Sequence, residues 1–545
     1  MTFKTAFFHH IVYLFVLLPV LNFNLASGLY TKGSVYCKSR NRCSFSPEVD
    51  TKATAYGTYN DTLLETGWGI LDVVAGQDKT YHVSDTGTMF AGGFLEGVLT
   101  AKRIYQHYQN MHYLFFNGES SEFISKVKQF FSDQDKWMRK MISEQGPKDP
   151  FWRHISYIAA QFDGLYYGYK SVAPSSQMLD VFAFQVLNGN GDLFDISHVV
   201  APDTIPNWSS MTKTQVHEYV VRHSMCSALI KVMGAYEDIF MSHSSWFMYE
   251  ATMRIFKHYN FKLKDSTMAA EKISFSSYPG YLESLDDFYL MGSGMVMLQT
   301  TNSIFNTSLY QFITPDSLLA WQRVRVANAM AHTGKEWATV LAKFNSGTYN
   351  NQYMVLDLKS IELNKTIHDG ALWVVEQIPT LVVSGDKTEV LRAGYWPSFN
   401  VPFFEEIYNM SGYPEMVEKH GVDMSYQLAP RNKIFRRDEG KVVDMKSMET
   451  IMRYNDYEKD PYSEDNSCNT ICCRGDLMET PGPFGCYDTK VSNYKMAQEF
   501  KAEIINGPTT ADGLPPFDWA KFNVSHVGLP EKYNFDFVLT KPAFP

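Results

Sequence analysis

The sequence predicts an α+β protein in which helices cover β-sheets. Long segments with helical periodicity fill much of the first half of the chain, and short β-rich segments bounded by turn residues dominate the second half. Such alternating blocks favour sheets covered by helices. With 45% hydrophobic and 15% aromatic residues among 545, the chain can bury a large core, and no Pro/Ser/Gly-rich linker divides it.

In the first half, apolar residues recur at helical spacing in three segments. These are Met89–Met111, Ser120–Ile142 and Phe151–Lys170, and we expect a helix in each. The stretch DVFAFQVLNGNGDLFDI (180–196) is predicted to be a strand. The part from 29 to 225 is therefore expected to be mostly helical.

After Cys226 the pattern changes to short segments typical of strands. These segments are CSALIKV, DIFMSHSSW, GSGMVMLQTTNSIF, YNNQYMVLDL and TLVVSGD. Two helices are predicted among them, YEATMRIFKHYNF (249–261) and DSLLAWQRVRVANAMAHTG (316–334).

The N-terminus has the layout of a cleavable secretory signal. Within residues 1–28, a weakly basic start precedes an eleven-residue apolar block from Ile11 to Leu21, and small residues follow at 26–28. The block is too short to span a bilayer, and no later segment offers ~18 uncharged apolar residues in a row. We expect a secreted or lysosomal protein that is soluble after removal of residues 1–28.

In a secreted protein, asparagines in sequons can be glycosylated and cysteines can form disulfides. Six N-x-S/T sequons are candidate glycosylation sites, namely Asn60, Asn207, Asn306, Asn364, Asn409 and Asn523. Six of the seven cysteines lie towards the two ends of the chain and can form disulfides in an oxidising compartment. Cys37 and Cys43 lie close enough in sequence to pair. Pairing stays open in the distal cluster, which comprises Cys468, Cys472, Cys473 and Cys486.

Charge and ligand patterns argue against several functions. A formal charge of −10 without a basic cluster argues against binding nucleic acid and against electrostatic docking on anionic membranes. A zinc site in the distal cysteine cluster is disfavoured because the cluster lacks a second well-spaced pair and nearby histidines. We therefore predict no metal, no cofactor and no integral membrane segment.

Cys226 is the one cysteine far from both ends of the chain. If CSALIKV and DIFMSHSSW form an antiparallel hairpin that turns at Met233–Glu237, the numbers of paired residues sum to roughly 471. Cys226 then lies opposite His243 to Ser245, with Trp246 close by. A cysteine near a histidine can form an activated thiolate nucleophile, but a lone cysteine in an apolar strand is usually a small buried hydrophobe.

Long blocks of the sequence occur in the order of a known family. The first half contributes GFLEGVLTA and GDLFDI. The second half contributes CSALIKV, SSYPGYLESLDDFYLMGSGMVMLQTT, FNSGTYNNQYMVLDLK, EQIPTLVVSGDKTEVL, YWPSFNVPFFE, PRNKIFRRD and IMRYNDYEKDP. From about Gly67 to the C-terminus, the chain resembles the phospholipase B-like family, also called lamina-ancestor-like, of lysosomal and secreted proteins.

The resemblance implies the fold of the N-terminal-nucleophile hydrolases, a four-layer αββα sandwich of two antiparallel sheets flanked by helices. In such proteins the precursor cuts its own chain before the nucleophile, and the new α-amino group serves as the base. By resemblance, cleavage of the Met225–Cys226 bond makes Cys226 the nucleophile and divides one composite domain into chains 29–225 and 226–545. Unperturbed pKa values of about 7.7–8 for the amine and about 8.5 for the thiol make proton exchange nearly balanced close to neutrality.

The resemblance also implies five further site residues. His243 and Trp246, in SHSSW, and Thr301, in QTT, match positions that line the family's site. Asn400 in SFNVP and Arg431 in APRNKIF match the polar pair expected to bind the oxyanion and the substrate headgroup. A fixed donor aimed at the developing charge can be worth about 3 kcal/mol.

The predicted function is phospholipase B-type removal of fatty acyl chains from glycerophospholipids through an acyl-thioester on Cys226. Three alternatives stay open: an amidase on N-acyl amides or short peptides, a catalytically inactive lipid- or glycan-binding protein of the same fold, and a cysteine hydrolase with an internal Cys–His pair. The expected partner is a phospholipid or another acyl substrate, and a homodimer is also considered.

Overall fold

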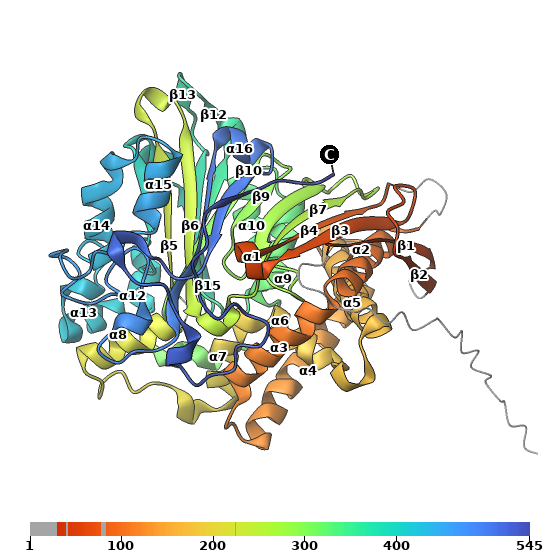
Figure 1. Ribbon diagram of the computed structural model, residues 1–545, viewed down its shortest axis with the longest axis horizontal. Coiled ribbons are helices and arrows are strands. Elements are labelled where there is room, and N and C mark those ends of the chain that lie inside the picture. Colours follow the sequence, from red (N-terminus) through yellow and green to blue (C-terminus); the bar gives the residue numbers. More distant parts are fainter. Residues whose placement is uncertain (1–29, 40–41, 78–82, 224, 545) are drawn as a thin grey trace, which may run out of the picture.

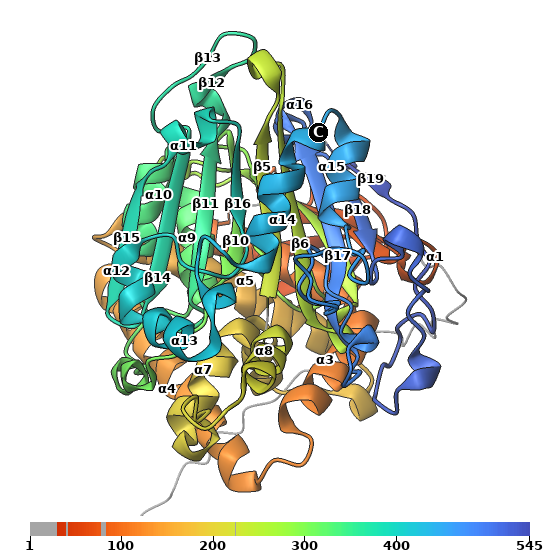
Figure 2. The same ribbon diagram turned by 90° about the vertical axis from the view of Figure 1, so that its left-hand side faces the viewer.

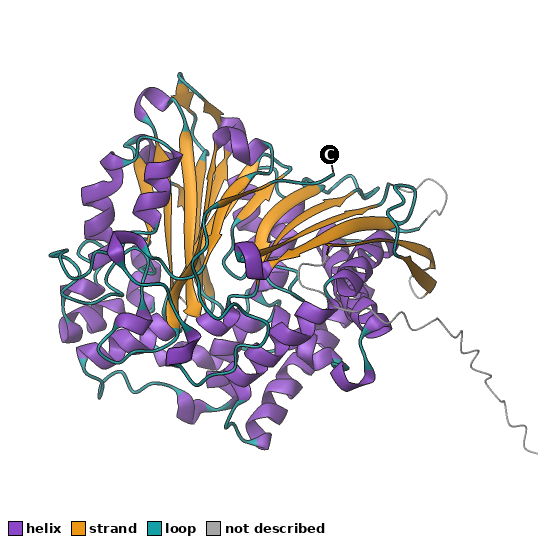
Figure 3. Cartoon of the chain, viewed as in Figure 1, coloured by secondary structure: helices purple, strands orange, loops and turns teal. Residues whose placement is uncertain are grey.

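Two β-sheets packed face to face form the centre of the protein, and helices cover both outer faces (Figure 1). The computed structural model describes residues 30–39, 42–77, 83–223 and 225–544. The predicted signal peptide, residues 1–28, lies outside the described residues. The expected αββα layering is confirmed, and Figure 3 displays the strands between their helical layers.

Sheet A, the larger sheet, contains eleven strands in the order β15-β14-β11-β10-β9-β8-β7-β4-β3-β1-β2. Its neighbouring strands are antiparallel except β4 and β7, which are parallel. This one parallel pair joins strands that precede Cys226 to strands that follow it. The strands are β1 (Tyr30–Ser39), β2 (Arg42–Ser46), β3 (Ala55–Thr62), β4 (Trp68–Ala75), β7 (Arg254–Phe261), β8 (Lys272–Ser277), β9 (Tyr289–Met291), β10 (Met295–Thr301), β11 (Asn351–Asp357), β14 (Leu372–Ile378) and β15 (Leu381–Asp386).

Sheet B is wholly antiparallel and has the order β16-β5-β6-β17-β18-β19. Figure 2, turned by 90°, shows β5, β6 and β17 from the side of the helices that cover them. A separate two-stranded ribbon pairs β12 (Ile361–Glu362) with β13 (Thr366–Ile367). The strands of sheet B are β5 (Met225–Val232), β6 (Ile239–Met248), β16 (Tyr395–Ser398), β17 (Phe484–Asn493), β18 (Ala502–Asn506) and β19 (Val538–Thr540).

Side chains along β5 and β6 alternate between the two faces of sheet B. Ile230 and Met241 face sheet A and pack in a core that includes Phe256 and Leu298. Leu229 faces the opposite way, into the core beneath the outer helices. Because successive side chains in a strand point to opposite faces, Cys226 belongs to the row that faces sheet A.

The helices that cover sheet A pack unusually closely on each other. Along the contact between α2 and α5, a Cβ added at Gly97 would lie 2.2 Å from the Leu165 carbonyl oxygen, and one at Gly168 would lie 2.0 Å from the Phe94 carbonyl oxygen. Glycine at these positions therefore permits backbone-to-backbone contact. The layer comprises α2 (Asp85–Leu99), α5 (Pro150–Val172), α9 (Ala320–Met330) and α10 (Gly334–Leu341).

A second layer covers the outer face of sheet B, and a group of helices closes one end of the sandwich. The layer over sheet B comprises α8 (Lys213–Arg222), α13 (Tyr413–His420), α14 (Pro430–Asp438) and α15 (Met445–Met452). The end group comprises α3 (Ala101–Phe116), α4 (Ser121–Gln145), α6 (Val181–Asn188) and α7 (Asn190–Val200). Shorter helices are α1 (Leu63–Thr66), α11 (Thr388–Arg392), α12 (Glu405–Met410) and α16 (Tyr494–Gln498).

Two predicted elements are wrong in type. The segment 180–196 forms α6 and α7 instead of a strand, and the Asp180 side chain caps α6 by accepting the Ala183 N–H. The segment 249–261 is largely strand β7 instead of a helix. Both faces of β7 are buried, with Phe256 on one side and Tyr259 on the other, so the alternation of a half-exposed strand is missing.

The first half also contains strands that the sequence patterns did not indicate. Residues 30–75 supply β1 to β4 and the one-turn helix α1, and the long helices predicted for 29–225 begin at α2. The predicted helix Met89–Met111 is divided at Thr100, which ends α2 and precedes α3. The predicted helices Ser120–Ile142 and Phe151–Lys170 are confirmed as α4 and α5.

Three disulfides are present in the described residues. Cys37 pairs with Cys43 as expected, across β1 and β2. The pairing that the sequence left open joins Cys468 to Cys473, and Cys472 to Cys486 at the start of β17.

Candidate active site

The predicted hairpin around Cys226 is confirmed, register included. Strands β5 and β6 pair so that Cys226 lies directly opposite Ser245, and Ala228 lies opposite His243. The connection turns through Ala235, whose φ is 53°. Residues directly opposite each other in an antiparallel pair project to the same face, so the Cys226 thiol and the Ser245 hydroxyl both face sheet A.

The Cys226 thiol is the free cysteine among the described residues and is 2% exposed. Burial raises the pKa of this thiol to about 12, and the backbone N–H of Trp246 and the charge of Lys490 act in the opposite direction. In the intact chain, Cys226 is therefore a protonated, enclosed thiol at neutral pH.

Asn400 holds the backbone nitrogen of Cys226. Its Oδ1 accepts the Cys226 N–H at 2.9 Å, and its Nδ2 donates to the Thr301 carbonyl oxygen at 2.6 Å. Asn400 follows edge strand β16 in the left-handed region, with φ of 67°, and its own carbonyl accepts from the Tyr413 hydroxyl at 3.0 Å. Every polar group of the side chain is engaged, so the amide has one fixed orientation.

Arg431 holds the other side of the Cys226 peptide. It lies in the first turn of α14 and donates to the carbonyl oxygens of Cys226 and Phe399. Its guanidinium also stacks over the Trp246 ring, 4.4 Å from the ring centre. Burial lowers the pKa of Arg431 to about 9.

His243 lies one step along the row from the Cys226–Ser245 pair, but its ring nitrogens are directed elsewhere. Nε2 is 2.8 Å from the Gln299 carbonyl oxygen, which can only accept, so Nε2 carries the hydrogen. Nδ1 is 3.1 Å from the Lys490 ammonium, which can only donate. Burial, helped by Lys490, lowers the pKa of His243 well below its ordinary value. The ring is a neutral, fully engaged tautomer.

Thr301 ends β10 in sheet A and reaches the same site from the opposite sheet. Its backbone carbonyl holds Asn400, and its hydroxyl lies near that of Tyr349. The structure thus brings Cys226, Asn400 and Thr301 into one chain of hydrogen bonds.

A family model described as Phospholipase B matches residues 55–540. The chain belongs to the phospholipase B family. Phospholipase-B 81 of Drysdalia coronoides is 52% identical over 501 residues, covering 91% of this chain and 90% of its own. Phospholipase B-like 1 is 49% identical over 539 residues in Bos taurus, covering 96% of both chains, and 49% identical over 522 residues in Homo sapiens, covering 95% of this chain and 92% of its own.

A much weaker similarity links the chain to a solved structure. A variant of the conjugated bile acid hydrolase from Clostridium perfringens aligns with a TM-score of 0.30 and 11% identity, over 59% of this chain and 100% of its own. This likeness is too low to support any conclusion about the phospholipase B family chain.

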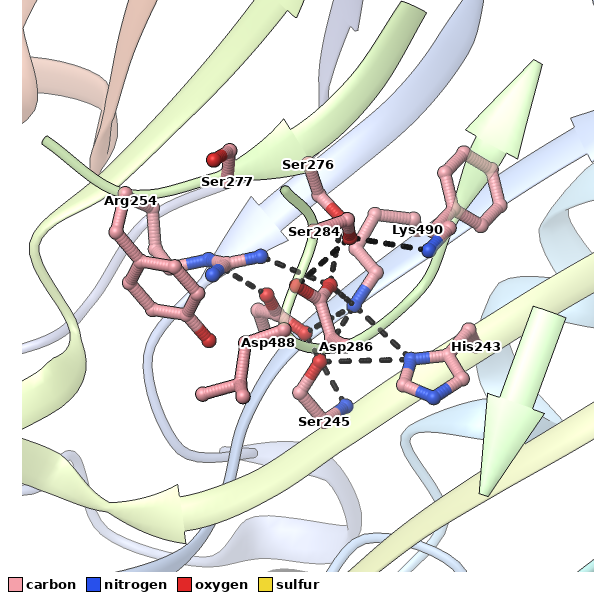
Figure 4. A network of polar contacts seen from close by, with 12 residues as sticks. His243, Ser245, Arg254, Ser276, Ser277, Ser284, Asp286, Asp488 and Lys490 are labelled. Carbon is pink, nitrogen blue, oxygen red and sulfur yellow. Dashed lines mark hydrogen bonds and ion pairs between the residues drawn. The ribbon is translucent and has the colours of Figure 1, made fainter. Parts of the chain in front are cut away.

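Sequence reasoning missed a buried group of four ionic side chains beside the thiol of this phospholipase B family member. This group, which we name the charged ring, comprises Arg254, Asp286, Asp488 and Lys490 (Figure 4). The signal that could have found it is a charge inside an otherwise strand-like apolar segment, as at Arg254 in RIFKHYNF and Lys490 in YDTKVSN. Burying an unpaired charge costs a large free energy, so a charged residue in such a segment predicts a buried partner of opposite charge.

Helix α8 packs against Trp246, on the outer face of sheet B. Its Val221 packs against Trp246 and the distal disulfides, and the Arg222 guanidinium lies 4.3 Å from the centre of the Phe484 ring. Because α8 ends at Arg222 and β5 begins at Met225, the helix that packs on Trp246 is the element that precedes Cys226 along the chain.

The six sequon asparagines differ in accessibility. Asn306 is half-buried, and its Nδ2 donates to the Met410 carbonyl oxygen at 3.1 Å. The exposed asparagines are Asn60, Asn207, Asn364, Asn409 and Asn523.

No group of three or more His, Cys, Asp or Glu side chains is arranged to hold a metal ion among the residues that the structure describes. In the same residues, no helix combines the length and the apolar character that crossing a bilayer requires.

Proposed function

We propose that this protein is a phospholipase B-type acyl hydrolase whose nucleophile is Cys226, freed by cleavage of the Met225–Cys226 bond. Membership of the phospholipase B family supports the hydrolase class. The observation that carries the mechanism is the 2.9 Å hydrogen bond from the Cys226 nitrogen to Asn400 Oδ1. It fixes the nitrogen that becomes the α-amino group.

The cleavage step needs only groups of this chain and one water. The Cys226 sulfur attacks the Met225 carbonyl carbon, and the peptide C–N bond breaks as the nitrogen takes a proton. Water then hydrolyses the thioester, which leaves a carboxyl on Met225 and a free thiol and α-amine on Cys226. Cleavage also removes the covalent link between β5 and α8, the helix whose Val221 packs against Trp246.

The α-amino group is the proposed base in the mature enzyme. An α-amine and a thiol have similar ordinary pKa values, about 8 and about 8.5, so the proton can move between them near neutrality. The amide oxygen of Asn400 accepts one amine hydrogen and thereby orients the nitrogen lone pair. His243 is a poor alternative, because Gln299 and Lys490 occupy both of its ring nitrogens. This argues against the internal Cys–His pair.

Substrate turnover follows the same chemistry. The thiolate attacks the ester carbonyl of a glycerophospholipid, the alcohol leaves with the proton held by the amine, and water releases the fatty acid from the thioester. We assign Asn400 and Arg431 to stabilising the charge on the carbonyl oxygen and holding the headgroup. Trp246 and Thr301 are proposed to line the substrate site.

A secreted or lysosomal location fits this proposal. Three disulfides and five exposed sequon asparagines suit an oxidising, glycosylating route. Glycosylation at the six sequons and removal of residues 1–28 are part of the proposal.

The test compares the wild-type chain with Cys226→Ala and Cys226→Ser. The wild type should yield a new terminus that begins Cys-Ser-Ala-Leu and should release fatty acid from phosphatidylcholine vesicles. Cys226→Ala should lose both, by at least about a thousandfold, because no nucleophile remains, while Cys226→Ser keeps a weaker nucleophile and tests whether sulfur is required. Active wild-type protein without that terminus would overturn the mechanism.

Matched substrates separate the alternatives. An ester and an amide that carry the same acyl chain are given to the processed enzyme. Faster amide cleavage would make the protein an amidase, and binding of both without turnover would make it an inactive lipid-binding member of the family.

A further inference from the structure

The charged ring connects the two sheets directly behind the nucleophile. Arg254 on β7 lies 2.9 Å from Asp286 and 2.9 Å from Asp488, measured between nitrogen and oxygen. Lys490 Nζ lies 2.6 Å from Asp286 and 2.7 Å from Asp488. The four charges alternate in sign around a closed ring, and each side chain is 2% exposed or less.

Stability alone is a poor explanation for the charged ring. The free energy of desolvating two buried ion pairs can match or exceed the attraction between the charges, and apolar side chains of similar volume would stabilise a core as well or better. Burial by itself would raise the pKa of Asp286, yet Arg254 and Lys490 hold that pKa well below its ordinary range. The Asp286 carboxylate therefore remains charged inside the protein.

One member of the ring reaches the row of the nucleophile. Lys490 Nζ donates to Ser245 Oγ at 2.6 Å and to His243 Nδ1 at 3.1 Å. Figure 4 shows the Lys490 nitrogen between the two carboxylates of the ring and these two residues of β6. The lysine is therefore the link between the ring and the hairpin.

Strand register carries the link on to Cys226. Ser245 pairs with Cys226 on one side and with Asp488 on the other, and the three side chains share the face towards sheet A. The Ser245 oxygen accepts a hydrogen from Lys490, which leaves its own O–H free to donate. The acceptor that Ser245 Oγ does face, His243 Nδ1, lies 3.4 Å away, which is long for a hydrogen bond, and its one lone pair also faces Lys490. The hydroxyl hydrogen can therefore turn from this long contact to the sulfur of the paired residue Cys226.

We infer that Lys490 is a positioning residue that acts through Ser245, holding the serine hydroxyl so that its hydrogen faces the Cys226 sulfur and stabilises the thiolate. The inference rests on the proposed role of Cys226 as nucleophile. As the S–H proton passes to the α-amine, the sulfur gains one negative charge, the nitrogen gains one positive charge, and Ser245 donates to the sulfur. No further reactant takes part.

The four charges of the charged ring sum to zero. The effect of the ring on the pKa of the Cys226 thiol therefore depends on which of its side chains is directed towards the sulfur. Lys490 is linked to the thiol through one hydroxyl, whereas both carboxylates are bound by Lys490 and Arg254 on its far side. The charged and titratable groups that surround the thiol from the packed elements are Lys490, Asp488, Asp286, His243, Tyr349 and Arg431.

The deciding experiment titrates the Cys226 thiolate by its ultraviolet absorbance in the processed protein. The spectrum of the same processed protein alkylated at Cys226 is subtracted, and the six disulfide-bonded cysteines do not contribute. Ser245→Ala, which leaves all four ion pairs of the ring in place, should raise the titration midpoint by about one pH unit, a tenfold loss of thiolate. Ser245→Thr keeps the hydroxyl and should restore the midpoint. An unchanged midpoint in Ser245→Ala would overturn the inference.

Two lysine variants separate positioning from stability. Lys490→Met should raise the midpoint at least as much as Ser245→Ala, and the double variant should equal Lys490→Met alone, because both act through one hydroxyl. Lys257→Met is the matched control. It removes an equally buried ammonium, 2.7 Å from Glu96, that lies outside the row of Cys226, so it should lower stability without moving the midpoint.

The outcomes also separate this inference from the proposed function. Absence of the Cys226 terminus in active wild-type protein rejects the proposed function before any titration. A normal Cys226 terminus with an unchanged titration midpoint in Ser245→Ala rejects only the positioning role of Lys490 and keeps the proposed function. If Lys490→Met does not fold, Ser245→Ala still decides.

Discussion

The space between the two sheets has two ends that are built from the same strands in opposite ways. Towards the hairpin turn, β5 and β6 contribute Ile230 and Met241, which pack with aromatic and aliphatic residues of sheet A. Towards the start of β5, the same face of the same strands carries Cys226, His243 and Ser245. One end is an apolar core, and the other is a network of charges and hydrogen bonds.

The two ends have different roles: the apolar end joins the two sheets, and the polar end surrounds the Cys226 thiol. The apolar end alone can join the two sheets, because apolar burial carries no desolvation cost. The polar end requires every group to be paired, and it meets that requirement through contacts between residues far apart in sequence. We therefore expect mutations at the apolar end to change stability and mutations at the polar end to change the thiol as well.

The largest expected loss of stability comes from the apolar end. Phe256→Ala removes a fully buried ring between the sheets and should lower the free energy of unfolding by about 4 kcal/mol. Denaturant unfolding measures the loss. The thiolate titration midpoint should stay at its wild-type value, and a shift would mean that the two ends are not independent.

A somewhat smaller loss, with a chemical effect, is expected at the polar end. Asp488→Asn leaves Arg254 and Lys490 sharing one carboxylate, and the uncompensated buried charge should cost about 3 kcal/mol. The same variant should also change the pH profile of kcat/KM, unlike Phe256→Ala. Equal pH profiles of kcat/KM in the two variants would contradict the separation between the apolar end and the polar end.

Much of the hairpin could be predicted from sequence, because its register depends only on a local turn and on the alternation of side chains. The numbers of Cys226 and Ser245 sum to the value that the turn position implies. Segments 180–196 and 249–261 were wrong because their residues are buried on more than one side. Their apolar patterns then reflect tertiary surroundings and no longer distinguish a helix from a strand.

Some residues of the candidate site could also be predicted from sequence, and others could not. Cys226, Asn400 and Arg431 were identified from a resemblance, and the structure places the side chains of Asn400 and Arg431 within hydrogen-bond distance of the Cys226 backbone. Lys490 was missed because β17 lies more than two hundred residues after β6 in sequence, and no local pattern announces their pairing. Long-range strand pairing is the information that one sequence lacks.

The smallest expected effect concerns a carboxyl that holds the loop after Asn400. Glu376 accepts the backbone N–H groups of Phe403 and Phe404 at 2.7 and 3.0 Å, and burial raises its pKa to about 7. Because the folded pKa exceeds the ordinary value of 4.5, the folded state retains a proton that the unfolded chain has lost. The contribution of Glu376 is therefore full at low pH and is lost as the pH rises towards 7.

The prediction compares wild type with Glu376→Gln at about pH 5 and about pH 7.5. The wild type should lose about 2 kcal/mol more unfolding free energy than the variant on going from the lower to the higher pH. Other titrating groups cancel in the difference between the two proteins. Parallel pH dependences would show that Glu376 does not set this behaviour.

The parallel contact between β4 and β7 has a practical consequence for a chain cut before Cys226. The smaller piece would contribute β1 to β4 to a continuous sheet whose remaining strands belong to the larger piece. Neither piece could leave without exposing a long unpaired edge and its buried side chains to water. The two polypeptides should therefore travel as a single particle through native chromatography and come apart only in denaturant.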